Sequence, residues 1–76
     1  MKVEIYGVED CTWCKKAVDW CEDNDVSYIY YDVTNTTDLI DQLIERIGKV
    51  ETVPQIFINE KHIGGYDDLV KTEVVA

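Results

Sequence analysis

Two cysteines separated by two residues, Cys11 and Cys14, carry the clearest chemical signal in this 76-residue chain. A thiolate can attack a disulfide, and a second thiol nearby can resolve the mixed disulfide that forms. Residues three positions apart in the first turn of a helix share one face, so their sulfur atoms can join. The pair therefore indicates thiol–disulfide exchange.

The segments around the pair predict a strand that leads into a helix. Residues 2–6 are typical of a buried strand, with Val3 and Ile5 on one face. Apolar residues then follow at helical spacing: Cys14, Ala17, Val18 and Cys21. Cys11 thus lies at a helix N-terminus, where unpaired N–H groups and the helix dipole favour a thiolate over a thiol. We expect Cys11 to be the nucleophile and Cys14 the resolving cysteine.

The middle of the chain predicts a second strand and a second helix. Residues 27–33 are rich in Tyr, Ile and Val, as strands are. The next helix ends at Gly48, a residue type that is common just past a helix C-terminus. Its apolar stripe, which we expect to face the sheet, consists of Leu39, Ile40, Leu43, Ile44 and Ile47.

The last third of the chain predicts a hairpin and a short helix. Residues 55–58 and 61–63 form the arms of the hairpin around a polar turn, and the helix begins near Asp67. We expect that helix to use Leu69, Val70 and Val74. The order β-α-β-α-β-β-α requires a parallel first β-α-β unit and an antiparallel hairpin. It therefore predicts one domain, residues 1–76, with a mixed four-stranded sheet flanked by helices.

Composition narrows the function classes. The chain has 16 acidic and 7 basic residues, a net charge of −9, which opposes binding to nucleic acid and to anionic membrane surfaces. Three cysteines are too few for the disulfide framework of a small secreted protein, which favours a reducing compartment. We find no charged leader with an apolar stretch and no apolar run of membrane-spanning length. We expect a cytoplasmic protein.

Four segments resemble the glutaredoxins in order and separation. They are residues 3–6 followed by Cys11-Thr12-Trp13-Cys14, then residues 52–58 (T-V-P-Q-I-F-I), then residues 62–65 (H-I-G-G), and then residues 66–69 (Y-D-D-L). The resemblance spans nearly the whole chain and implies the thioredoxin-like fold. It also implies a glutathione-dependent oxidoreductase that reduces protein disulfides and glutathione mixed disulfides.

The resemblance further implies a glutathione site. The Val53–Pro54 bond is expected to be cis, with Thr52 in the same loop and the Val53 backbone paired with glutathione. Backbone N–H groups of Tyr66 and Asp67 are expected to bind the γ-glutamyl carboxylate. The complete set of expected glutathione-binding residues is Trp13, Thr52, Val53, Pro54, Tyr66, Asp67 and Asp68, with Asp68 facing the ammonium group.

The chain departs from the family pattern near the cysteines. Many glutaredoxins have a lysine three residues before the first cysteine, and Val8 stands there in this chain. The candidate replacements are Lys15, Lys16 and Lys49. Between the cysteines, Thr12 replaces the usual Pro and Trp13 the usual Tyr.

Other interpretations of these residues remain open. One is a [2Fe–2S] carrier in which Cys11 and glutathione bind a cluster between two chains. Another is a glutaredoxin-like thioredoxin that serves ribonucleotide reductase and is reduced by a thioredoxin reductase. The principal interpretation needs no bound cofactor or metal. Its expected partners are glutathione and disulfide-containing or glutathionylated proteins, with ribonucleotide reductase one of them, and the protein is expected to be a monomer.

The remaining cysteine and the histidine have simpler interpretations. Cys21 lies seven residues after Cys14 on the same apolar helix face, so we expect a small core residue. About 10.5 Å of helical rise separates the two, too far for a shared bridge. His62 lies on a hairpin strand, and we expect it to have a structural role.

Overall fold

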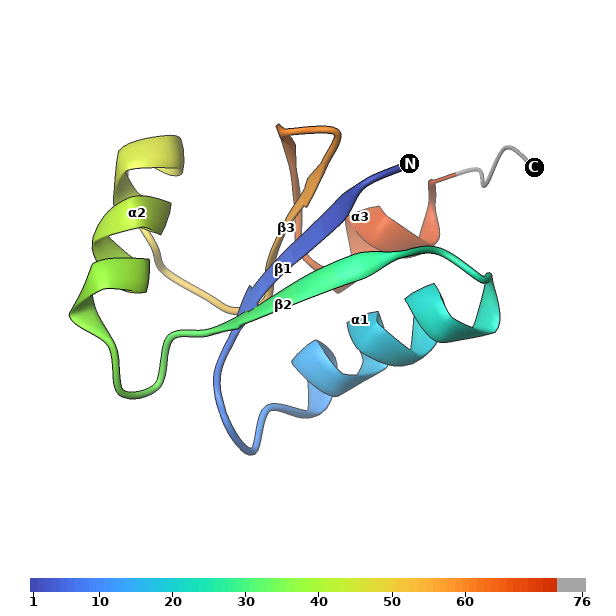
Figure 1. Ribbon diagram of the computed structural model, residues 1–76, viewed down its shortest axis with the longest axis horizontal. Helices are drawn as coiled ribbons and strands as arrows, with labels where there is room; N and C mark the ends of the chain where they lie inside the picture. The colour runs from blue at the N-terminus through green and yellow to red at the C-terminus, as the bar shows by residue number, and fades with distance from the viewer. Residues whose placement is uncertain (73–76) are drawn as a thin grey trace.

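The computed structural model describes residues 1–72, which form a four-stranded sheet with helices on both faces (Figure 1). The order is the predicted β-α-β-α-β-β-α. Its elements are β1 (Val3–Gly7), α1 (Thr12–Asp23), β2 (Tyr28–Asp32), α2 (Thr37–Ile47), β3 (Gln55–Ile58), β4 (Lys61–Gly64) and α3 (Tyr66–Val70).

The sheet has the strand order β2-β1-β3-β4. Strand β1 pairs in parallel with β2 and antiparallel with β3, and β3 continues into the antiparallel hairpin with β4. The predicted mixed sheet is therefore confirmed. Strand β1, which is paired on both of its edges, ends at Gly7, four residues before Cys11. A central strand of the sheet therefore leads to the cysteine pair.

Each face of the sheet has its own apolar cluster. The first lies between the sheet, α1 and α3, and consists of Val3, Ile5, Ala17, Cys21, Ile56 and Leu69. The second lies on the α2 side and consists of Tyr6, Val33, Leu43 and Phe57. Both clusters draw on β1 and β3, which are buried on both faces for this reason. Figure 1 shows α2 well apart from α1 and α3.

Left-handed backbone conformations mark the ends of several elements. Asp25, with φ of 56°, follows α1, and Gly48, with φ of 86°, follows α2. In the hairpin, Asn59 and Glu60 have φ of 50° and 70°, the pair of positive values that a type I′ turn requires. The predicted turn is therefore confirmed. A glutamate is an uncommon residue in this conformation.

Two expectations about helix faces were wrong. Ile44, which was expected to face the sheet, and Val70, which was expected to be among the residues that α3 uses, are each 40% exposed. Their neighbours Leu43 and Leu69 are fully buried, and consecutive helical residues point about 100° apart. On α2, Leu43 lies within the core, and the other stripe residues Leu39, Ile40 and Ile47 are half-buried against the second cluster. The expectation for Val74 lies outside the described residues.

Within residues 1–72, none of the helices combines the length and the apolar character that crossing a membrane requires.

Candidate active site

Cys11 is the N-cap residue of α1. Its backbone is extended (φ −104°, ψ 108°), and its sulfur accepts a hydrogen bond from the backbone N–H of Cys14 at 3.1 Å. The backbone N–H of Lys15 donates a hydrogen bond to the Cys11 carbonyl at 3.0 Å, the first of the i to i+4 hydrogen bonds of the helix. The sulfur of Cys11 thus takes the place that a Ser or Asp oxygen usually holds at a helix N-cap. The position favours a thiolate when the disulfide opens.

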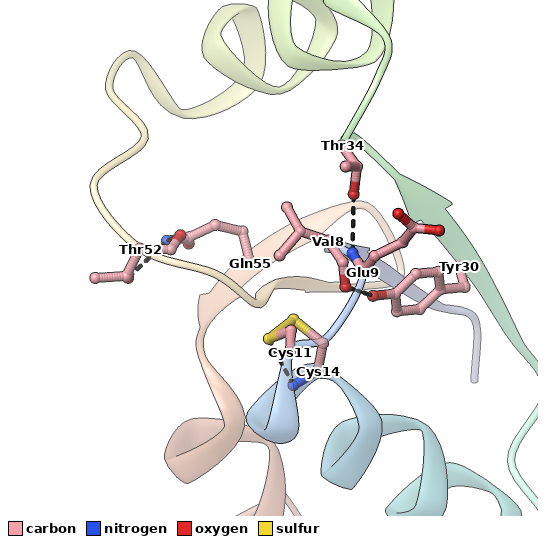
Figure 2. Close-up of a disulfide and its surroundings, with 8 residues drawn as sticks. All are labelled: Val8, Glu9, Cys11, Cys14, Tyr30, Thr34, Thr52 and Gln55. Carbon is pink, nitrogen blue, oxygen red and sulfur yellow. Dashed lines mark hydrogen bonds between the residues drawn. A yellow bond between two sulfur atoms is a disulfide. The ribbon is translucent and has the colours of Figure 1, made fainter.

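Cys11 and Cys14 form a disulfide, with their α-carbons 5.2 Å apart (Figure 2). The two cysteines differ in exposure, because Cys11 is half-buried and Cys14 is 1% exposed. An attacking thiol can therefore reach Cys11, whereas Cys14 is enclosed. This asymmetry fits the predicted nucleophile and resolving cysteine.

Gly7 allows Cys14 to be enclosed in this way. A Cβ atom on Gly7 would contact the Tyr30 hydroxyl and would lie 2.8 Å from Cys14 Sγ. The Tyr30 hydroxyl donates a hydrogen bond to the Val8 carbonyl at 3.1 Å, which holds the ring beside the disulfide (Figure 2). The end of β1 and a residue of β2 thus form the wall behind the resolving sulfur.

A loop with a cis peptide bond forms another side of the site. The Val53–Pro54 bond is cis, as predicted. Gln55 supports the loop, because its side-chain amide donates to the Thr52 carbonyl at 2.8 Å. His62 Nε2 lies 2.7 Å from the side-chain oxygen Oε1 of Gln55. His62 thus has a structural contact, as expected.

A groove of about 240 Å³ lies between this loop and the start of α3. It is lined by Trp13, Thr52, Val53, Pro54, Gly65, Tyr66, Asp67 and Asp68. The structure thus brings together the seven residues expected to bind glutathione and adds Gly65. Trp13 is 52% exposed, and its ring lies 5.5 Å from that of Tyr66. The two rings leave an open aromatic surface beside the cysteines.

The start of α3 is capped by one of the expected binding residues. Asp68 Oδ2 accepts a hydrogen bond from the Gly65 N–H at 3.3 Å. A Cβ atom on Gly64, where φ is 119°, would collide with this carboxylate. The missing side chain of Gly64 therefore provides room for the carboxylate of Asp68, which is an exposed residue at the groove.

The three candidate lysines lie in different places. Lys16 Nζ lies over the Trp13 ring, 4.7 Å from its centroid, at the wall of the groove. Lys49 forms an exposed ion pair with Glu51 at 2.8 Å. Lys15 lines a different pocket.

This second pocket adjoins Cys11 and has a volume of about 670 Å³. It is lined by Val8, Asp10, Cys11, Thr12, Lys15, Val18, Tyr28 and Tyr30. The sequence did not indicate it, because its walls come from β2 and α1, which only the folded sheet brings together.

Cys21 has no part in the site. It is fully buried in the cluster between the sheet and α1, as expected, and burial raises the pKa of its thiol to about 11. Within residues 1–72, no three side chains among His, Cys, Asp and Glu gather in an arrangement that could hold a metal ion.

Comparison with known proteins decides the family. The glutaredoxin family model matches residues 3–63. The chain belongs to the glutaredoxin family. Glutaredoxin 1 of Escherichia coli is 39% identical over 74 residues, which cover 90% of this chain and 87% of that protein. Glutaredoxin 3 of the same species is 40% identical over 67 residues, which cover 88% of this chain and 80% of that protein.

Solved glutaredoxin structures share the fold. Reduced Escherichia coli glutaredoxin has a TM-score of 0.77 at 38% identity, covering 93% of this chain and 91% of that chain. Francisella tularensis glutaredoxin 1, complexed with cacodylate, has a TM-score of 0.76 at 28% identity, covering 92% of this chain and 88% of that chain. This glutaredoxin thus has the thioredoxin-like fold that the resemblance implied. Family membership and the Cys11–Cys14 disulfide together make the protein a thiol–disulfide oxidoreductase.

Proposed function

We propose that this glutaredoxin uses glutathione as its reductant and acts on protein disulfides and on glutathione mixed disulfides. The observation that carries the proposal is the groove between the cis-proline loop and α3. It is lined by all seven residues that the resemblance assigned to glutathione, and one of them, Trp13, stands between Cys11 and Cys14 in the chain.

Glutathione is held in the groove along its backbone and at its γ-glutamyl end. The main chain of Val53 pairs with the cysteinyl residue of glutathione, as an added strand pairs with a sheet edge. N–H groups of Tyr66 and Asp67 bind the γ-glutamyl carboxylate, and the carboxylate of Asp68 binds the ammonium group. Trp13 covers the tripeptide from the α1 side.

The reaction begins when the Cys11 thiolate attacks one sulfur of a substrate disulfide. A new S–S bond forms, and the other sulfur leaves as a thiolate that takes a proton from water. With a protein disulfide, Cys14 then attacks Cys11, releases the reduced protein and leaves the Cys11–Cys14 disulfide. Two glutathione molecules reduce this disulfide and become glutathione disulfide.

With a glutathionylated protein the cycle is shorter. Cys11 attacks the glutathione sulfur, the protein thiol leaves, and a second glutathione reduces the Cys11–glutathione disulfide. Cys14 takes no part in this branch. The groove matters in both branches, because it holds the glutathione whose sulfur must meet Cys11.

The test compares reductants and then removes one contact. Turnover of a small glutathione mixed disulfide is measured with glutathione and glutathione reductase, and separately with NADPH and a thioredoxin reductase. We expect turnover with the first system. Asp68→Asn, which can still accept the Gly65 hydrogen bond, should raise the KM for glutathione about three- to tenfold.

The matched control is Glu45→Gln, a loss of one exposed charge on α2. It should leave the KM for glutathione within experimental error. Turnover with thioredoxin reductase alone would reject glutathione as the reductant. An unchanged KM in Asp68→Asn would reject the role of Asp68.

A further inference from the structure

The larger pocket beside Cys11 shares no lining residue with the glutathione groove. Its volume of about 670 Å³ is within the usual range of ligand pockets, and the groove, at about 240 Å³, is much smaller. Cys11 itself lines the larger pocket. A molecule bound there would therefore lie beside the sulfur that forms the mixed disulfide.

The pocket has an apolar floor and a polar rim. The floor consists of four half-buried side chains, Val8, Val18, Tyr28 and Tyr30. The rim consists of three exposed residues, Asp10, Thr12 and Lys15. An apolar centre within a polar margin is typical of surfaces that bind a polypeptide side chain.

The aromatic floor is held in place by hydrogen bonds. The Tyr30 hydroxyl donates to the Val8 carbonyl at 3.1 Å, and Figure 2 shows this ring beside the disulfide. The Tyr28 hydroxyl donates to Glu22 Oε2 at 3.2 Å. The two rings therefore form a surface that is already in place before a substrate arrives.

Negative charge surrounds this floor. Asp10 is at the rim, and Glu22 bonds to Tyr28. Asp32 lies two residues after Tyr30 on the same face of β2, and burial, followed by the charge of Asp32, raises the pKa of the Tyr30 phenol. Among the lining residues, Lys15 is the one cation. The field in the pocket thus favours a positively charged ligand.

We propose that this pocket binds the polypeptide around the target cysteine of a protein substrate, taking up an apolar side chain and a neighbouring Lys or Arg. The inference rests on the proposed function and names the substrate class for it. Glutathione occupies the groove on one side of Cys11, and the substrate protein contacts the pocket on the other. An apolar side chain covers Tyr28 and Tyr30, and the basic side chain lies near Asp10.

The experiment uses glutathionylated peptides of equal length. In the first, Leu and Lys flank the cysteine; in the second, Leu and Glu; in the third, Gly and Ser. We expect kcat/KM for the Lys peptide to exceed that for the Glu peptide about five- to tenfold at low ionic strength. The ratio should shrink in 0.5 M salt, because salt screens these charges.

Variants locate this preference in the pocket. Asp10→Asn, which keeps a side chain that tolerates the φ of 54°, should reduce the Lys-to-Glu ratio at least twofold. Asp41→Asn on α2 removes the same charge away from the pocket and should leave the ratio unchanged. Because a ratio is measured, any change in the reactivity of Cys11 cancels.

A second variant tests the apolar floor. Tyr28→Ala should lower kcat/KM for the Lys peptide toward that for the Gly-Ser peptide and leave a small glutathione mixed disulfide unaffected. Equal rates for the Lys and Glu peptides in the wild-type protein would overturn the inference. So would an equal effect of Asp10→Asn and Asp41→Asn. If glutathione reduces none of the substrates, the proposed function fails, and this result is distinct from a loss of peptide preference.

Discussion

The backbone N–H of Cys14 points at the sulfur of Cys11 across 3.1 Å, while the sulfur of Cys14 is packed against Gly7. The same helical turn therefore gives the two cysteines opposite surroundings. Cys11 has a hydrogen-bond donor, a helix N-terminus and access to solvent. Cys14 has an enclosed position in which it can meet Cys11 and little else.

The first prediction concerns the reactivity of Cys11. Its thiolate should be stabilised by the N–H of Cys14, although Glu9 and Asp10 oppose it. In Cys14→Ser, which keeps this backbone donor, alkylation of Cys11 by iodoacetamide should be half-maximal at a pH below 8.5, the value of a free cysteine. A midpoint at or above 8.5 would show that the N-cap position does not activate the sulfur.

The thiol of Cys21, unlike that of Cys11, should resist ionisation. Burial raises its thiol pKa to about 11, so the native protein keeps the proton at a pH where the unfolded chain has released it. The free energy of unfolding should therefore fall as pH rises from 9 to 11, by at most about 1.4 kcal/mol per unit. Chemical denaturation of wild type and Cys21→Ala across this range measures the effect, and Cys21→Ala should have the shallower slope. Identical slopes would contradict the prediction.

Glu4 and Arg46 form a pair that holds α2 against the sheet. The guanidinium reaches both carboxylate oxygens at 3.2 Å, and the side chains are only 7% and 23% exposed. Arg46→Met leaves a buried carboxylate without its partner and should lower the free energy of unfolding by about 2–4 kcal/mol. The double variant with Glu4→Gln should recover part of this loss. Urea denaturation at pH 7 would contradict the prediction if Arg46→Met were as stable as wild type.

The same pair predicts a dependence on acid. Burial alone would raise the pKa of Glu4, but the hydrogen bonds and charge of Arg46 prevail and lower it below 4.5. The carboxylate thus contributes stability that is present above pH 4.5 and is lost as pH falls through the folded-state pKa. Between pH 5 and pH 3, wild type should lose more stability than Glu4→Gln. Parallel losses would exclude this contribution of Glu4.

Gly7 should tolerate no side chain. In Gly7→Ala the new methyl group would collide with the Tyr30 hydroxyl and with Cys14 Sγ. We expect a loss of about 1–3 kcal/mol in the free energy of unfolding of the oxidised protein. The loss should be smaller when Gly7→Ala is made in a Tyr30→Phe background, because the nearest obstructing atom is gone. Thermal denaturation of the four proteins tests both statements.

Much of the site could be predicted because its signals are local. The N-cap position of Cys11 follows from a strand, a turn and a helical pattern within a few residues. The groove followed from motifs whose spacing resembles that of a known family. The groove joins three segments that are distant in the sequence, so the resemblance predicted it and local patterns did not.

Features that depend on distant contacts could not be predicted. Glu4 lies in a buried strand, and its partner Arg46 is 42 positions away. The pocket beside Cys11 needs Tyr30 of β2 to approach the start of α1. Ile44 fits the apolar stripe of α2, yet the docking angle of that helix leaves it 40% exposed. Such contacts follow from how the elements pack.

The central claim is that Cys11 alone attacks the substrate disulfide and that Cys14 serves only to resolve mixed disulfides with protein substrates. The most direct measurement is glutathione-coupled reduction of a small glutathione mixed disulfide by wild type, Cys11→Ser and Cys14→Ser. We predict that Cys11→Ser is inactive and that Cys14→Ser keeps a substantial share of wild-type kcat. Activity in Cys11→Ser, or an equal loss in both variants, would contradict the account.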